Sequence, residues 1–177
     1  MVTGRRWIVL ALLSTGCLEV GGFEWHVDVP THTARLTLTG LTSSSETDTV
    51  GDLRTLVDDY VNGENLAKRF PHAKFGPRTL RVDGDQLVLD VTIDWTFAQD
   101  LGWRDWDAAR PYRFCPESDY HVEAANADFR DSEGCVVWDA GRTALDVTSA
   151  NSPHDRVSLV PAFTAWEAAG RPTAQPL

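Results

Sequence analysis

The strongest structural signal in the chain is the run Thr79-Leu80-Arg81-Val82-Asp83-Gly84-Asp85-Gln86-Leu87-Val88-Leu89-Asp90-Val91-Thr92-Ile93-Asp94-Trp95. Its middle, Asp83-Gly84-Asp85, is typical of a hairpin turn because glycine adopts a positive φ without steric cost. After the turn, apolar and polar residues alternate, and alternation places the two kinds on opposite faces of a strand. The run therefore predicts an antiparallel hairpin with an apolar face toward the core and Asp90, Thr92 and Asp94 toward water.

A second hairpin is predicted upstream. Residues 23–29 alternate aromatic residues and valines with Glu24, His26 and Asp28, residues 34–39 alternate apolar with polar residues, and Pro30 separates the two runs. Shorter strands are predicted at residues 112–115, 120–129, 135–138 and 144–148. These patterns indicate a sheet built mainly from hairpins, with one solvated face.

Helical spacing of apolar residues appears in two places. Residues 49–61 carry it most clearly, after a capping-box-like start at Thr49-Val50-Gly51-Asp52, and residues 64–70 predict a short helix stopped by Pro71. Residues 161–169 predict a C-terminal helix that ends at Gly170. The predicted fold class is α+β, an antiparallel sheet of hairpins with one main helix and a C-terminal helix packed on one face.

The N-terminus predicts an export signal. Arg5 and Arg6 precede an apolar run at residues 7–13 and the small residues Ser14-Thr15-Gly16, as in a signal peptide cleaved after residue 16. The apolar run is far shorter than the roughly 20 residues that a membrane-spanning helix needs. The predicted organisation is a signal peptide at 1–16, a tether at 17–22, a single α+β domain at 23–170, within the size of one domain, and a flexible tail at 171–177.

Leu13-Ser14-Thr15-Gly16-Cys17 resembles the lipobox of bacterial lipoproteins. The resemblance covers only about the first 20 residues, and Ser14 stands where the family prefers leucine. It implies that Cys17 carries acyl chains that hold the protein to a membrane of the cell envelope. Leu18 is not acidic, which in this family points to the outer membrane. Ser14 and Gly16 also suit ordinary signal peptidase, which leaves a periplasmic or secreted protein as the alternative.

Charge and cysteine content fit an exported protein. The chain carries 16 basic and 26 acidic residues, and without residues 1–16 it carries 14 basic and 26 acidic residues, a formal charge of −12. Such a charge repels nucleic acid, which we exclude as a partner. With Cys17 acylated, Cys115 and Cys135 remain as an even pair, and we predict a disulfide between them.

Two clusters are candidates for ligand binding. Residues 126–134 contain Asp128, Asp131 and Glu133, oxygen donors suited to a hard cation, but their spacing is not that of an EF-hand and a polar hairpin loop before Cys135 is the preferred interpretation. Trp103 and Trp106, beside Asp105 and Asp107, have rings that could stack on a sugar or pack into the core.

No arrangement in the sequence predicts a catalytic site, a cofactor or a metal ion. The five histidines are scattered, and neither G-x-S-x-G nor G-x-G-x-x-G occurs. The predicted function is non-catalytic binding or scaffolding in the envelope, with another envelope protein or a glycan as partner. The alternatives are an extracytoplasmic carboxylate-dependent hydrolase, which needs two acids across a cleft, and a carbohydrate-binding module.

Overall fold

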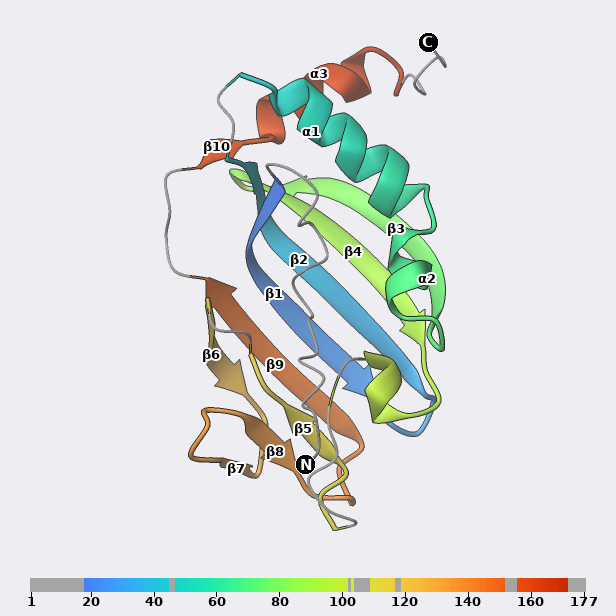
Figure 1. The fold of residues 1–177 in the computed structure, drawn as a ribbon, viewed down its shortest axis with the longest axis vertical. Coiled ribbons are helices and arrows are strands. Elements are labelled where there is room, and N and C mark those ends of the chain that lie inside the picture. Colours follow the sequence, from blue (N-terminus) through green and yellow to red (C-terminus); the bar gives the residue numbers. More distant parts are fainter. Residues whose placement is uncertain are drawn as a thin grey trace, which may run out of the picture.

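The chain folds around one large antiparallel sheet (Figure 1). The structure is a computed structural model that describes residues 18–44, 47–101, 103, 109–116, 119–151 and 156–171. The strands of the large sheet lie in the order β3-β4-β2-β1-β9-β6, and β10 pairs with β2. Their bounds are β1 Leu18–Asp28, β2 Thr33–Ser43, β3 Lys74–Asp83, β4 Gln86–Asp94, β6 Tyr120–Ala125, β9 Ala144–Asn151 and β10 Val157–Ser158. The mainly antiparallel α+β class predicted from the sequence is confirmed.

The hairpin with the strongest sequence signal is present as β3 and β4. Asp83 pairs with Gln86 across the turn, and Gly84 has a φ of 60°. Strand β4 ends at Asp94, and Leu87, Leu89, Val91 and Ile93 are buried. The period-two pattern therefore predicts the direction of these side chains correctly.

The hairpin of β1 and β2 is longer than its pattern predicts. Trp25 pairs with Leu36 as the alternation requires, but β1 begins at Leu18, so residues 18–22 belong to the sheet and do not form the predicted tether. The sequence does not predict this extension because Gly21 and Gly22 interrupt the alternation of apolar and polar residues. Glycine inside a strand is typical of a bend or of a close approach of two backbones.

A glycine corner, formed by Gly21, Gly22 and Gly40, bends this hairpin. A Cβ atom on Gly21 would lie 3.3 Å from the Cα of Gly40, and Gly40 has a φ of 60°. On both strands the buried positions change parity at the corner. Apart from Gly22 and Thr37, which are also buried, the buried positions are 18, 20, 23, 25 and 27 in β1 and 34, 36, 38, 41 and 43 in β2. The corner thus turns the last residues of the hairpin back toward the same core.

Strand β9 joins the hairpin to the C-terminal half of the chain. It pairs with β1 on one side and with β6 on the other, and Trp25 lies opposite Val147. The strand predicted over residues 120–129 is wrong in extent, because β6 ends at Ala125. Phe129–Arg130 forms β7, which belongs to a second sheet.

The second sheet has three short strands in the order β5-β8-β7. Their bounds are β5 Tyr112–Phe114, β7 Phe129–Arg130 and β8 Val136–Trp138. The predicted disulfide joins Cys115, directly after β5, to Cys135, directly before β8. The bridge therefore ties together two strands that already pair.

Apart from η3, which the sequence does not predict, the helices occur where the apolar spacing predicts them. Helix α1 (Thr49–Thr55) continues into the π-helical segment η2 (Leu56–Val61), and α2 (Asn65–Arg69), η3 (Ala98–Leu101) and α3 (Val160–Ala168) follow. The N-cap of α1 is Asp48 and not the predicted Thr49, because an Asp48 carboxylate oxygen accepts the Gly51 N–H at 3.1 Å. No helix in the described ranges has the length and apolar character to cross a bilayer.

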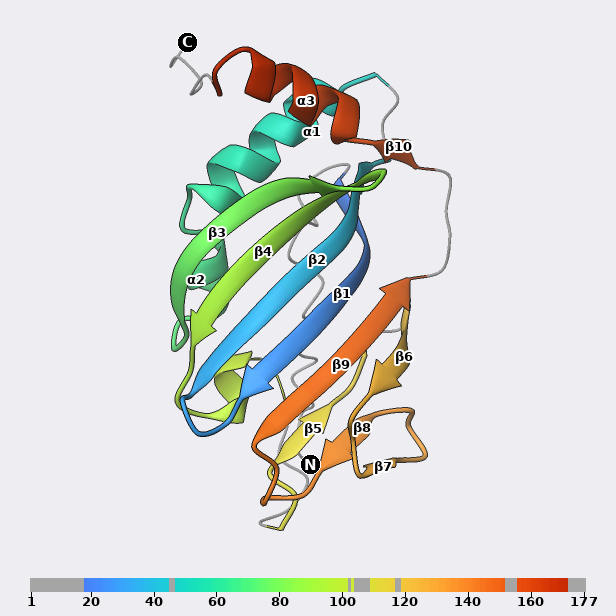
Figure 2. The same ribbon diagram turned by 180° about the vertical axis from the view of Figure 1, so that it is seen from behind.

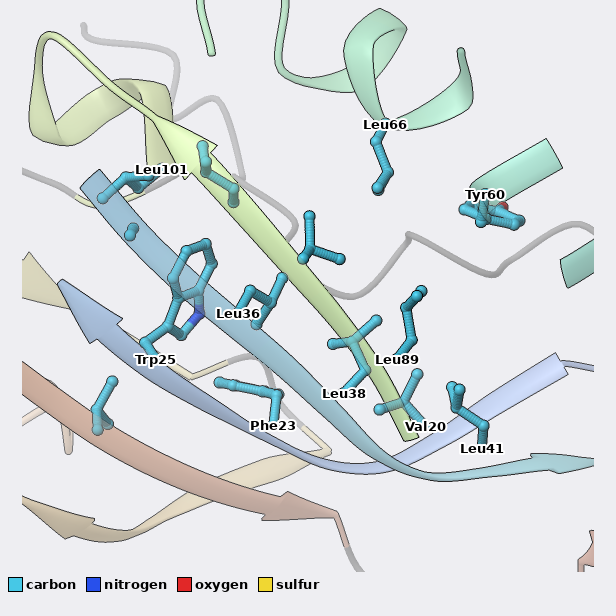
Figure 3. Close-up of a cluster of buried hydrophobic side chains, with 14 of the residues drawn as sticks. Val20, Phe23, Trp25, Leu36, Leu38, Leu41, Tyr60, Leu66, Leu89 and Leu101 are labelled. Atoms are coloured by element: carbon cyan, nitrogen blue, oxygen red, sulfur yellow. The ribbon is translucent and has the colours of Figure 1, made fainter. Parts of the chain in front are cut away.

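The core lies between the large sheet and the elements on its inner face. Figure 3 shows Trp25, Leu36 and Leu89 projecting from the sheet toward the side on which Tyr60 and Leu66 lie. Phe114 and Trp138 of the second sheet belong to the same buried cluster. On the other side, Figure 2 shows the strands β4, β2, β1 and β9 open to view, with no helix in front of them.

Candidate ligand-binding groove

Trp103 lies in the core and not on the surface. Only 2% of it is exposed, its ring stacks on Trp138 at 5.1 Å between centroids, and its edge meets Trp25 at 6.2 Å. The ring therefore presents no face to a sugar or a peptide. Trp106, Asp105 and Asp107 lie outside the described residues.

Asp131 forms a buried ion pair with Arg113. The Arg113 Nη2–H and Nε–H donate to one carboxylate oxygen of Asp131 at 2.6 and 2.9 Å, and the two side chains are 10% and 5% exposed. The other oxygen accepts the backbone N–H groups of Glu133 and Cys135. Burial would raise the pKa of Asp131, but these hydrogen bonds outweigh burial and lower the pKa. Asp131 thus orders the loop beside the disulfide.

The other two acids of the cluster also face arginines. Asp128 accepts hydrogen bonds from Arg142 and from the Asp139 N–H, and these lower its pKa to about 2. Glu133 accepts from Arg113 at 2.8 Å. Within the described part of the chain no three acidic, histidine or cysteine side chains are grouped to hold a metal ion. Guanidinium groups occupy the positions that a cation would need.

A groove of about 250 Å³ lies between η2, β3 and α3. Its floor is apolar and consists of residues that the helical and strand patterns predict as core. Its mouth is polar. We call the apolar lining residues the floor, namely Val57, Val61, Leu80, Phe163 and Trp166, and the polar lining residues the mouth, namely Asp58, Asn62, Thr79 and Arg171.

The apolar floor follows from side-chain spacing on three elements. Val57 and Val61 lie four residues apart and share one side of η2, as Phe163 and Trp166, three apart, share one side of α3. Phe163 is buried, and its ring lies 5.7 Å from that of Trp166. The two helical segments therefore bring apolar sides to one depression over β3.

Arg78 fixes one wall of the groove. Its guanidinium donates to the backbone carbonyl of Tyr60 at 2.9 Å and of Gly63 at 2.5 Å. Tyr60 lies in the last turn of η2 and Gly63 lies two residues beyond its end, where carbonyls lack intrahelical partners and carry partial negative charge. Arg78 thus holds the C-terminal end of η2 against β3.

Arg171 lies at the mouth of the groove. Its guanidinium carbon is 5.7 Å from the centre of the Trp166 ring, and it forms an ion pair with Glu167. Arg171 is therefore ordered by α3, and the tail predicted from residue 171 does not include it. Residues 172–177 lie outside the described part.

The groove belongs to the end of the molecule where β1 starts. Leu18 lies opposite Ser43, Ser43 lies opposite Val157 of β10, and α3 begins at Val160. Figures 1 and 2 agree in placing β10, α3 and the start of β1 at the same end. A ligand in the groove would therefore lie near the residue that follows Cys17.

A second polar arrangement, missed by the sequence analysis, runs from the buried Trp138 to the exposed His26 on the open face of the sheet. The Trp138 Nε1–H donates to Asn126 and the Asn126 amide donates to Asp146, each at 2.7 Å, and Asp146 contacts Nδ1 of His26 at 2.5 Å. Since 62% of the His26 side chain is exposed, the imidazole meets water and no enclosed substrate. This chain of contacts fastens β9 to β1.

Among these features, the groove is the arrangement best suited to a ligand. An apolar floor with a few polar groups at the mouth is the usual form of a small-molecule site. Sequence reasoning found its residues as core positions and could not show that two helices leave a gap between them. No protein family matches the chain, and searches of curated proteins and of solved structures gave no match.

Proposed function

We propose that this chain is an exported, lipid-anchored binding protein of a bacterial cell envelope, with the groove as its ligand site. The observation that carries the proposal is the place of the groove, at the end of the domain that begins one residue after Cys17. In this proposal the main helix and the C-terminal helix pack on the same face of the sheet, as predicted from the sequence.

Two observations support export. The Cys115–Cys135 bridge is of a kind that persists in oxidising compartments. The start of β1 at Leu18 leaves no spacer after Cys17, so acyl chains on that cysteine would hold the domain directly at the membrane surface. With a formal charge of −12 after removal of residues 1–16, the domain depends on acyl chains and not on basic residues for attachment.

The hydrolase alternative gains no support from the described residues. A glycosidase-type general acid needs a raised pKa, and the carboxyl groups of Asp28, Asp90, Asp128 and Asp131 all have lowered pKa values. The groove itself contains one carboxylate, that of Asp58. An envelope protein or a glycan as partner, and the outer membrane as location, remain predictions from the sequence.

The export and anchor are tested by the intact mass of the protein extracted from membranes, with and without reduction. We expect the mass of the chain from Cys17 plus acyl groups, and a gain of two hydrogens when the bridge opens. Recovery of the protein with Met1 attached and no added mass would contradict the proposal.

Binding in the groove is tested with 8-anilinonaphthalene-1-sulfonate, an amphipathic dye. We expect one dye molecule per chain and loss of binding in Val61→Phe, which narrows the groove. Phe97→Ser is the matched control, because Phe97 is an exposed apolar residue that does not line the groove. Equal loss of binding in both variants would contradict the site.

A further inference from the structure

We propose that the groove holds the hydrocarbon chain of a single-chain carboxylate, a fatty acid from the adjoining membrane, with its carboxylate at Arg171. This inference rests on the proposed function, since it names the ligand of the same groove. Size, charge and position each contribute to it.

The size and the floor of the groove suit one hydrocarbon chain. The volume of about 250 Å³ lies just below the range of roughly 300–1,000 Å³ common for drug-sized ligands. A lipid with two acyl chains would not fit, whereas a segment of one chain would. The floor residues Val57, Val61, Leu80, Phe163 and Trp166 offer no charged group to the chain.

The charges at the mouth favour a single negative group. The Arg171 guanidinium can donate hydrogen bonds to a ligand carboxylate because its present partner, Glu167, is held only in a surface ion pair, with the two side chains 61% and 40% exposed. Such pairs contribute little, so a carboxylate of the ligand can replace that of Glu167. Asp58 also lines the groove and would repel a second negative charge, which favours a carboxylate over a doubly charged phosphate.

The position of the groove indicates that the ligand comes from the membrane. Leu18 and Val157 both pair with Ser43 of β2, one on each side. Helix α3 starts three residues after Val157. Its nine residues span only about 13 Å, so the groove lies within a short distance of the start of β1. A protein anchored through Cys17 would therefore hold this groove beside the bilayer.

The test uses residues 17–177, the chain that remains after removal of the predicted signal peptide, with Cys17→Ser so that no acyl chain is attached, and sodium laurate as the probe in calorimetric titration. We expect one laurate per chain. From octanoate through decanoate to laurate, the affinity should rise about fourfold for each methylene, the factor that burial of a methylene produces.

Variants distinguish the contribution of the ligand's carboxylate to binding from that of its hydrocarbon chain. Arg171→Gln should weaken laurate about tenfold and leave dodecanol unchanged, while Asp58→Asn should tighten laurate and not dodecanol. Val61→Phe should weaken both ligands. Arg35→Gln is the control, an exposed arginine on the open face of the sheet, and should change neither.

Other results would overturn the inference. These are no binding of laurate, or binding that neither Arg171→Gln nor Val61→Phe changes. A chain ending at Arg171 that binds laurate while the full chain does not would assign the groove to residues 172–177. If the native protein is acylated but its Cys17→Ser form does not bind laurate, the fatty-acid ligand is contradicted and the lipid anchor is not. Laurate binding by a protein that is never acylated would refute the anchor, the membrane source of the ligand and the proposed function.

Discussion

Ion pairs with Arg113 and Arg142 hold the acidic segment 126–134 in place. Arg113 and Asp131 are the most buried charged pair described, and every carboxylate oxygen of Asp131 has a donor. A buried charge that loses its partner costs far more than an exposed one. The acids that resemble a cation site in the sequence are therefore better explained as supports of the disulfide loop.

Asp131→Ala should destabilise the protein by about 3 kcal/mol, because it leaves the Arg113 guanidinium buried without its main partner. The free energy of unfolding in urea measures this. Asp128→Ala is the control: its partner Arg142 is exposed, and the loss should be clearly smaller. Equal losses in the two variants would contradict the structural role of Asp131.

Acid should weaken the fold through the same carboxylates. The pKa values of Asp90, Asp128 and Asp131 are lower in the folded chain than the ordinary value of 3.8. Their contribution to the free energy of unfolding is therefore complete above pH 3.8. It is lost as the pH falls through the pKa of the folded state, which is about 2 for Asp128. Urea unfolding between pH 6 and pH 2 should show constant stability and then a decline below about pH 4. A chain equally stable at pH 2 would contradict these pairings.

At the scale of the elements, two local features decide how the strands and the main helix are placed. The glycine corner bends the hairpin of β1 and β2, and Asp48 sets the start of α1. Both depend on contacts that one substitution can remove.

Gly22→Ala should destabilise the protein by about 2 kcal/mol. The added Cβ would lie 2.8 Å from the carbonyl oxygen of Ser149 in β9, so the strands would have to separate. Gly141→Ala is the control, because a Cβ there meets nothing within 4 Å. Thermal unfolding of both variants tests the corner, and an unchanged midpoint in Gly22→Ala would show that β1 and β9 do not approach this closely.

Asp48→Ala should cost about 1 kcal/mol, the usual effect of losing an N-cap. Thr49→Ala should cost less, because the Asp48 side chain and not that of Thr49 accepts the Gly51 N–H. Denaturant unfolding of the two variants compares them directly. A larger loss in Thr49→Ala would restore the cap predicted from the sequence.

At the scale of the whole molecule, the sheet is continuous from one end to the other, and the disulfide braces the end that carries the second sheet. The two cysteines are 20 residues apart. The intervening chain includes β6 and β7, which belong to different sheets. The bridge thus closes a loop that contributes to both sheets.

Opening the bridge should destabilise the protein by about 3 kcal/mol, as expected for a loop of this length. The comparison is urea unfolding of the native protein and of Cys115→Ser/Cys135→Ser. Binding of laurate should remain in the double variant at urea concentrations where it is folded, because neither cysteine lines the groove.

Local patterns in the sequence are sufficient to predict the individual strands and helices. Period-two and helical spacing predict the hairpins 79–94 and 23–39, the helix at 49–61 and the C-terminal helix, because both periodicities follow from backbone geometry within a few residues. The pairing of Cys115 with Cys135 followed from the count of three cysteines once Cys17 was assigned to the lipid anchor.

Contacts between residues far apart in the chain could be established only from the folded structure. It placed β9 beside β1, took Trp103 into the core, gave Asp131 to Arg113, and left a groove between η2 and α3. The physical reason is that burial and ion pairing depend on which surfaces meet in space. The sequence cannot distinguish a tryptophan in the core from one at a binding site. The Asp131 carboxylate pairs with Arg113, 18 residues away, and is therefore not available to bind a cation.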